Sequence, residues 1–215
     1  MPKLDARLKA VAKQIRGHTH VDIGSDHGHL LLALIKSGRI ERGIAIESNQ
    51  QPFENSRRTL IGVNAEVRFG DGLAVLKPGE GDSLSICGLG SETMRDILLA
   101  FPDRWPDRVV LQPNLRPEVV RRWALENEFH LIHEHVSRGY WPYAIMTFER
   151  AKNPDPIYEG LDLNSALIFG PHEIRRMDDG LIAQLKEELE YWRAFDQLEG
   201  KRAVRLAAIE RLLEA

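Results

Sequence analysis

A chain of 215 residues, 43% hydrophobic and 28% charged, can bury one α/β core and carry a small additional unit. No apolar run approaches the ~20 residues of a membrane span. The first residues also lack the apolar segment of a signal peptide, so we expect a cytoplasmic protein that does not contact a membrane. The one cysteine, Cys87, excludes an intrachain disulfide and a multi-cysteine zinc site.

Charge is unevenly distributed along the chain. The formal net charge of −3 argues against a surface that binds polyanions everywhere. Residues 1–16 contain five basic side chains and one acidic side chain, whereas the segment from residue 152 onward contains nine basic and thirteen acidic ones. We therefore expect any nucleic-acid surface in the part of the chain before residue 152.

The first predicted element is a helix over residues 3–16, because its apolar residues recur at spacings that place them on one face. These residues are Leu4, Leu8, Val11 and Ile15. Lys9, Lys13 and Arg16 fall on the opposite face, where they form either a phosphate-binding surface or an ordinary solvated one.

Strands and helices then alternate as far as residue 127. The predicted strands are short apolar runs at 20–24, 42–47, 66–70, 83–88 and 108–112. The predicted helices cover 28–38, 50–62, 92–101 and 116–127. Nearly continuous apolar strands that alternate with helices indicate a parallel sheet covered on both faces.

The pattern changes after residue 128. Two β-like runs, 129–136 and 143–148, have no helix between them and are expected to pair as an antiparallel hairpin. The Asn-Pro-Asp-Pro sequence at 153–156 breaks regular structure. We place a domain boundary there, between 1–153 and 154–215. Beyond Pro171, two amphipathic stretches separated by Gly200 predict a small C-terminal helical hairpin.

The loop after the first predicted strand indicates the type of ligand. The run from Asp22 to Gly28 reads Asp-Ile-Gly-Ser-Asp-His-Gly, a strand end and a small-residue loop before a helix N-terminus. A dinucleotide site reads Gly-x-Gly-x-x-Gly, with its acid about 20 residues later. Here Asp22 lies within the strand and Asp26 replaces the middle glycine, so a pyrophosphate would be repelled and a cationic ligand favoured. This motif resembles the first motif of class I S-adenosylmethionine (AdoMet) methyltransferases. A parallel sheet ending in an antiparallel hairpin is also their Rossmann-like, seven-strand layout.

Three acids stand at the ends of consecutive predicted strands, and these ends meet at one edge of the sheet. Glu47 is suited to accept both ribose hydroxyls of such a ligand, Asp71 an adenine amino group, and Asp26 the methionine end. The alternative is that Asp26 and Asp71 are helix caps. His27 and His29 flank Gly28, but without a third ligand they do not predict a metal site.

Four motifs and the C-terminal pattern resemble one family, the bacterial tRNA (adenine-N1)-methyltransferases that modify adenine 22. The motifs are Asp22-Ile-Gly-Ser-Asp-His27, Gly70-Asp-Gly-Leu73, Gly88-Leu-Gly90 and Leu111-Gln-Pro-Asn114, and Phe169-Gly-Pro171 follows before the C-terminal helices. The resemblance implies an AdoMet site of Asp22, Gly24, Ser25, Asp26, His27, Glu47, Asp71, Gly72 and Gly88. It implies a target base near Gln112, Pro113, Asn114 and Tyr143, with Asn114 and Asp26 as the catalytic residues. Tyr140, Trp141 and Tyr143 are candidates to stack on that base.

The chain also departs from the family pattern. Ser91 stands where a second glycine is usual, His29 replaces an aromatic residue, and the hairpin segment 139–144 lacks the usual Lys and Glu. Two other hypotheses therefore stay open: an AdoMet methyltransferase acting on another RNA site or a small molecule, and a non-catalytic AdoMet- or partner-binding module. A tRNA partner would be held by Lys9, Lys13 and Arg16 together with the arginines after the fourth and fifth strands. Those arginines are Arg95, Arg104, Arg116, Arg121 and Arg122.

Overall fold

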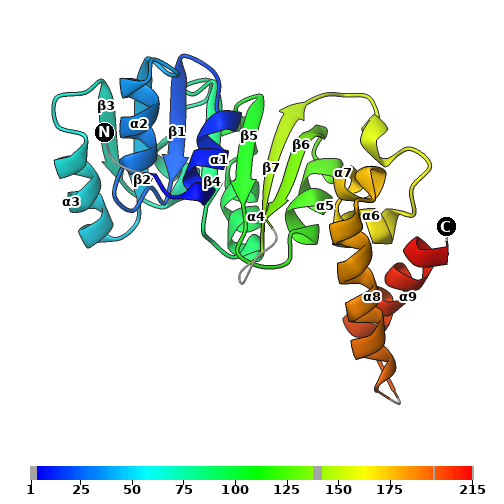
Figure 1. Ribbon diagram of the computed structural model, residues 1–215. Helices are drawn as coiled ribbons and strands as arrows, with labels where there is room; N and C mark the ends of the chain where they lie inside the picture. The colour runs from blue at the N-terminus through cyan, green and yellow to red at the C-terminus, as the bar shows by residue number, and fades with distance from the viewer. Residues whose placement is uncertain (1–3, 138–141, 196, 215) are drawn as a thin grey trace.

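The computed structural model describes residues 4–137, 142–195 and 197–214, and they contain a seven-stranded sheet in the order β3-β2-β1-β4-β5-β7-β6 (Figure 1). The first five strands are parallel, and β7 is antiparallel to both β5 and β6. The strands are β1 (Thr19–Ile23), β2 (Arg42–Glu47), β3 (Ala65–Phe69), β4 (Ser83–Cys87), β5 (Arg108–Gln112), β6 (Phe129–Ser137) and β7 (Tyr143–Arg150). The predicted parallel sheet with a final antiparallel hairpin is confirmed.

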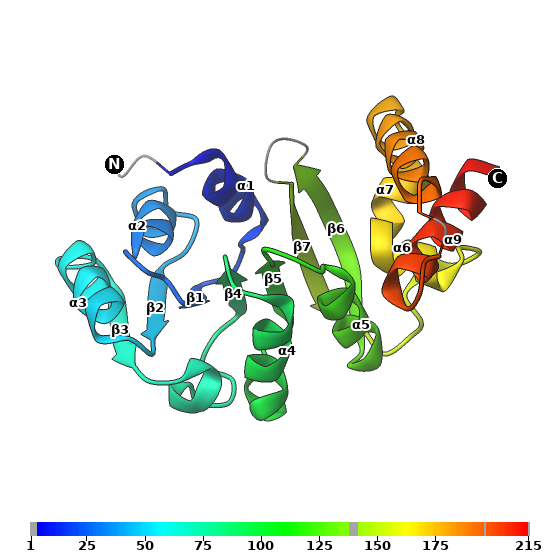
Figure 2. The ribbon, with the colours of Figure 1, turned by 90° about the horizontal axis from the view of Figure 1, so that it is seen from below.

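Helices cover both faces of the sheet (Figure 2). One face carries α1 (Ala6–Gln14), α2 (His29–Lys36) and α3 (Gln50–Thr59), and the other carries α4 (Ser91–Ala100) and α5 (Glu118–Glu126). Because successive strand side chains point to opposite faces, each strand contributes to two cores. Ile44 and Ile46 pack in the core with α4 and α5, whereas Ala45 packs with α1 and α2. Three short 3₁₀ helices complete this part: η1 (Gly72–Val75), η2 (Pro102–Arg104) and η3 (Pro156–Tyr158).

Among the described residues of the C-terminal part, two short α-helices precede the two that were expected beyond Pro171. In chain order, these helices are α6 (Leu163–Phe169), α7 (Pro171–Arg176), α8 (Asp179–Arg193) and α9 (Lys201–Glu214). The helices α8 and α9 form the predicted hairpin, and their apolar residues share a core with α6 and α7. The two short helices were missed because each has fewer than eight residues, which is too short for a helical period to be recognised. No helix in the described parts of the chain is long and apolar enough to cross a membrane.

A buried ion pair joins the C-terminal helices to the sheet. Arg121 of α5 is 1% exposed and contacts Glu134 of β6 through Nη2 at 2.6 Å. Its Nη1 donates to the backbone oxygen of Leu167 in α6. The expectation that Arg121 holds phosphate is therefore wrong, because its guanidinium is enclosed and its hydrogen bonds are used within the protein.

Candidate active site

The loop after β1 brings backbone groups to the carboxyl edge of the sheet. The amide of Gly24 donates to the backbone oxygen of Ile46 at 2.9 Å, which holds the loop against the end of β2. Gly28 has φ +68° and caps α2, and a Cβ there would lie 3.1 Å from the Leu60 side chain. Only glycine combines this positive φ with such close packing. The loop between these glycines therefore has a defined shape, with Ser25, Asp26 and His27 on it.

Beneath this loop lies a buried chain of hydrogen bonds. Asp22 is 3% exposed and accepts from Ser85 Oγ at 2.5 Å and from Ser25 Oγ at 2.7 Å. Burial raises the pKa of the Asp22 carboxyl. Because Ser85 gives its single hydroxyl proton to Asp22, its 2.9 Å contact with His20 makes His20 Nε2 the donor. Burial lowers the pKa of His20 to about 3, so this histidine is neutral.

Glu47, the last residue of β2, is 5% exposed and accepts a hydrogen bond from the Asp26 amide. The pKa of Glu47 is raised to about 7, chiefly by burial and also by the nearby Asp22 and Asp26 charges, against the lowering effect of the Asp26 amide. The Glu47 carboxylate has further lone pairs, so it can accept hydrogen bonds from a ligand at the end of this strand.

The three acids predicted at strand ends lie where expected, since β3, β2 and β1 are neighbours in the sheet. Asp26 is exposed, and its carboxylate is 3.5 Å from His27 Nε2. Asp71 is also exposed and follows β3. The capping alternative is wrong for both side chains. The cap of α2 is Gly28, and Asp71 stands at the N-cap of η1 without a side-chain capping hydrogen bond.

Gly72 immediately follows Asp71 and has φ +50°. A Cβ at this position would lie 2.8 Å from Ile97 of α4. A side chain here would therefore clash with the helix and also strain the backbone.

The substrate-side motif forms a second set of interlocked loops, after β4 and β5. The Gly88 amide donates to the backbone oxygen of Gln112 at 2.9 Å, and Asn114 Nδ2 donates to the Gly88 oxygen at 2.6 Å. The Gln112 side chain is buried and donates to the Pro113 oxygen at 3.0 Å. The Asn114 side chain is exposed, so its carbonyl oxygen can accept from a ligand.

Tyr143 begins β7 and is half-buried against the core that contains α1 and α2. Leu111 of β5 pairs with Met146 of β7, and Tyr143 itself pairs with Ser137 of β6. Tyr140 and Trp141, the other two candidates for stacking, lie outside the described residues, as does part of the departing 139–144 segment.

The other two departures from the family pattern are local. His29 is the exposed first residue of α2 and stacks on His27, with ring centroids 5.5 Å apart. Ser91 is the buried first residue of α4, and its hydroxyl donates to the Leu115 oxygen, which ties the loops after β4 and β5 together. Among the described residues, no group of three His, Cys, Asp or Glu side chains is arranged to hold a metal ion.

Sequence reasoning missed Arg7, which the structure brings to the centre of this edge. Its Nη1 donates to Gln112 Oε1 and lies 3.5 Å from where a Cβ on Gly88 would be. Its charge also lowers the pKa of Asp22. On a helical wheel Arg7 falls beside Leu4 and Val11 rather than on the face of Lys9, and this position was the available signal.

Among the predicted phosphate-binding cations, Lys9, Lys13 and Arg16 are exposed, as expected for either a phosphate surface or a solvated face. Arg104 is half-buried and donates to the backbone oxygens of Leu73 and Ala74 at 2.8 and 2.7 Å. Its hydrogen bonds hold η1 in place, so it is a structural residue and a poor candidate for phosphate.

A mostly parallel seven-stranded sheet that ends in a reversed hairpin, with acids at the carboxyl ends of its first three strands, defines a Rossmann-like class I methyltransferase. The family model described as tRNA (adenine(22)-N(1))-methyltransferase matches residues 20–214, and the chain belongs to this family. The family expected from the sequence motifs is confirmed.

Individual relatives agree with this assignment. The tRNA (adenine(22)-N(1))-methyltransferase of Bacillus subtilis strain 168 is 31% identical in an alignment of 196 positions that covers 88% of this chain and 82% of the relative. The crystal structure of the B. subtilis m1A22 tRNA methyltransferase TrmK has a TM-score of 0.84 and 27% identity, covering 100% of this chain and 97% of that one. M. capricolum TrmK in complex with S-adenosyl-homocysteine has a TM-score of 0.74 at 21% identity, over 98% and 95% of the two chains, and supports the fold.

Proposed function

We propose that this protein transfers the methyl group of AdoMet to N1 of adenine 22 in tRNA. The observation that carries the proposal is the buried Glu47 carboxylate at the glycine-containing loop, in a chain that belongs to the adenine-22 methyltransferase family. A tRNA substrate also favours the cytoplasm as the compartment.

The residues at the edge of the sheet fit AdoMet. Glu47 has one oxygen bonded to the Asp26 amide and would accept the ribose hydroxyls with its remaining lone pairs. Asp71 is exposed and free of a capping role, so it would accept from the adenine amino group. The methionine end would lie against the backbone and side chains of the loops after β1, β3 and β4. These residues are Asp22, Gly24, Ser25, Asp26, His27, Gly72 and Gly88.

When bound, AdoMet supplies an electrophilic methyl group. Neutral adenine N1 carries its own lone pair, so the protein needs no general base to prepare the nucleophile. Its task is to position the base for in-line displacement and to stabilise the cationic product. Asn114 would accept from the adenine amino group with its carbonyl oxygen, because its NH₂ is held by Gly88. Asp26 would supply negative charge, and Gln112, Pro113 and Tyr143 would form the wall around the base.

Arg7 would act on Asn114 indirectly, as a positioning residue. Arg7 orients the buried side chain of Gln112. The backbone oxygen of Gln112 accepts from the Gly88 amide, and the Gly88 oxygen in turn accepts from the Asn114 side chain.

The proposed function is tested by incubating the protein with labelled AdoMet and an unmodified tRNA transcript that contains adenine 22. We expect label in that transcript, located at N1 of adenine 22, and none in a matched transcript with guanine at position 22. Equal labelling of both transcripts would favour another RNA site. Binding of AdoMet without labelling of any tRNA would favour a small-molecule substrate or a non-catalytic module.

Cofactor binding should depend on pH through Glu47. Its pKa of about 7 means that the carboxylate form, which accepts ribose hydroxyls best, is gained as pH rises through 7. We therefore expect AdoMet affinity to increase between about pH 6 and pH 8 and then level off. Isothermal titration calorimetry at each pH measures this, with Glu47→Gln as the control. The same pH dependence in that variant would show that another group carries it.

Stability of the protein without cofactor should change in the opposite direction. Because Glu47 keeps its proton to higher pH when folded, its contribution to stability is fully present below its ordinary pKa of 4.5. That contribution is lost as pH rises through about 7.

A further inference from the structure

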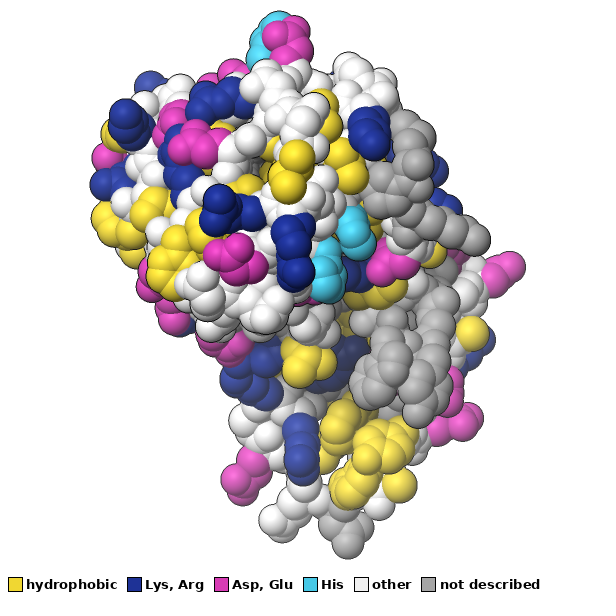
Figure 3. Space-filling view, turned by 90° about the vertical axis from the view of Figure 1, so that its left-hand side faces the viewer, with side chains coloured by type: hydrophobic (Ala, Val, Ile, Leu, Met, Phe, Trp, Pro, Cys, Tyr) yellow, Lys and Arg dark blue, Asp and Glu magenta, His cyan; other side chains and the backbone are white. Residues whose placement is uncertain are grey.

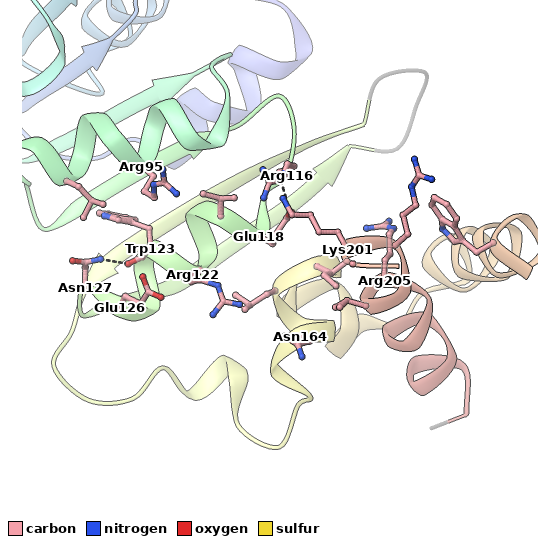
Figure 4. A pocket seen from close by; sticks show the side chains of 18 residues that line it. Arg95, Arg116, Glu118, Arg122, Trp123, Glu126, Asn127, Asn164, Lys201 and Arg205 are labelled. Carbon is pink, nitrogen blue, oxygen red and sulfur yellow. Dashed lines mark hydrogen bonds and ion pairs between the residues drawn. The ribbon is translucent and has the colours of Figure 1, made fainter. Parts of the chain in front are cut away.

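A cleft of about 840 Å³ lies between the catalytic domain and the C-terminal helices (Figure 4). Its walls come from α4 and α5 on one side and from α6, α8 and α9 on the other. It is separate from the cofactor edge, and none of the predicted cofactor residues lines it. Apolar side chains such as Leu99, Val119 and Val204 also line it.

The cleft is basic although the molecule as a whole is acidic. Six of its lining side chains are basic and two, Glu118 and Glu126, are acidic. The basic residues are Arg95, Arg116, Arg122, Lys201, Arg202 and Arg205. In Figure 3, basic side chains are visible where the broad upper part of the molecule meets the narrower lower part.

Half of these cations are not neutralised by the protein. Arg95 pairs with Asp96, Arg116 with Glu92 and Glu118, and Arg205 with Glu188. Arg122, Lys201 and Arg202 are exposed, and their side chains form no ion pair or hydrogen bond with any residue that the structure describes. Arg122 belongs to α5 and the other two to α9, so free positive charge lines both walls.

One end of the cleft lies close in the chain to the substrate side of the active site. Arg116 lines the cleft and is two residues beyond Asn114, and its ion pair with Glu92 joins the loop after β5 to the first turn of α4. In Figure 1, the end of α8 and the start of α9 lie below the sheet, on the side where β6 ends. On that side the parallel strands also carry their carboxyl ends, because β6 runs parallel to β5.

We propose that this cleft holds the phosphate backbone of the tRNA while the target adenine occupies the site beside Asn114, an inference that rests on the proposed function. Charge complementarity identifies the occupant, because a polyanion gains from every cation that the protein leaves unpaired. The guanidinium groups of Arg122 and Arg202 can each donate two hydrogen bonds to one phosphate. The C-terminal hairpin therefore takes part in RNA binding despite its net negative charge, since its cations face the cleft.

The test compares two triple variants of the full-length protein. One is Arg122→Gln, Lys201→Gln and Arg202→Gln, which neutralises the cleft. The matched control is Lys36→Gln, Lys77→Gln and Lys152→Gln, which removes three exposed positive charges that do not line the cleft. The tRNA dissociation constant is measured over a range of salt concentrations, and calorimetry with AdoMet checks that both variants are folded.

In the cleft variant we expect weaker tRNA binding and a log–log salt dependence that is shallower by about 0.7–0.9 for each phosphate that the protein no longer neutralises. AdoMet affinity should not change, and the control variant should keep the salt dependence of the unaltered protein. An unchanged slope in the cleft variant would overturn the proposal and leave the cleft for an acidic protein partner. Failure of the unaltered protein to bind tRNA would overturn the proposed function itself, and with it this occupant.

Discussion

Replacing Glu47 by alanine should weaken AdoMet binding by roughly 10- to 150-fold for each hydrogen bond to the ribose that is removed. A hydrogen bond to a charged group contributes about 1.5–3 kcal/mol, and every 1.4 kcal/mol is about tenfold in affinity. Glu47 is 5% exposed, so water would not easily replace the missing acceptor. Calorimetry with AdoMet and with its demethylated product measures the decrease in affinity.

The control for this prediction is Glu41→Ala, which removes an exposed acid that lies just before β2 and pairs with His18. Its AdoMet affinity should equal that of the unaltered protein. An unchanged affinity in Glu47→Ala would show that the ribose lies elsewhere. Tight binding of NAD by the unaltered protein, with no heat from AdoMet, would contradict the assignment of the whole edge.

Replacing Arg121 by methionine should lower the free energy of unfolding by about 3–5 kcal/mol, because it leaves the Glu134 carboxylate buried and unpaired. It also removes the hydrogen bond from Arg121 to the Leu167 oxygen, which holds α6 against α5. Urea denaturation of the single variant measures the change. A decrease below about 1 kcal/mol would show that the pair contributes little to joining the C-terminal helices to the sheet.

Two further variants identify the cause of that destabilisation. Arg122→Met changes the neighbouring, exposed arginine and should alter stability by no more than about 0.5 kcal/mol. The double variant Arg121→Met and Glu134→Leu removes both charges and should recover much of the stability, since a buried pair replaced by apolar side chains is often neutral. No recovery would mean that the hydrogen bond to Leu167, rather than the unpaired charge, dominates.

Sequence patterns alone were enough to place the acids of the candidate site. Asp26, Glu47 and Asp71 end or follow strands whose apolar runs are easily recognised, and parallel neighbouring strands must present these ends at one edge. The nature of the ligand followed from Asp22 and Asp26, since acids at these points repel a pyrophosphate. The family followed from motifs that are each a few residues long.

Other features depended on contacts between residues distant in the chain. Arg7 reaches Gln112 across 105 positions, and its role emerges only when α1 packs beside β5. Whether Asp26 and Asp71 cap helices depended on where the helices actually begin. Local propensity does not specify such details, because they are decided by tertiary packing.

The charged residues show most clearly which properties follow from the sequence and which require the tertiary structure. The sequence by itself determined the seven strands, the acids at their ends and the balance of charge in each segment, because these are properties of short stretches of chain. Only the tertiary structure decided that Arg121 is enclosed by Glu134 and α6, while the adjacent Arg122 lines a cleft together with Lys201 and Arg202. The physical reason is that a cation's role depends on its solvent exposure and its partners, and both arise from helices that meet only when the chain has folded.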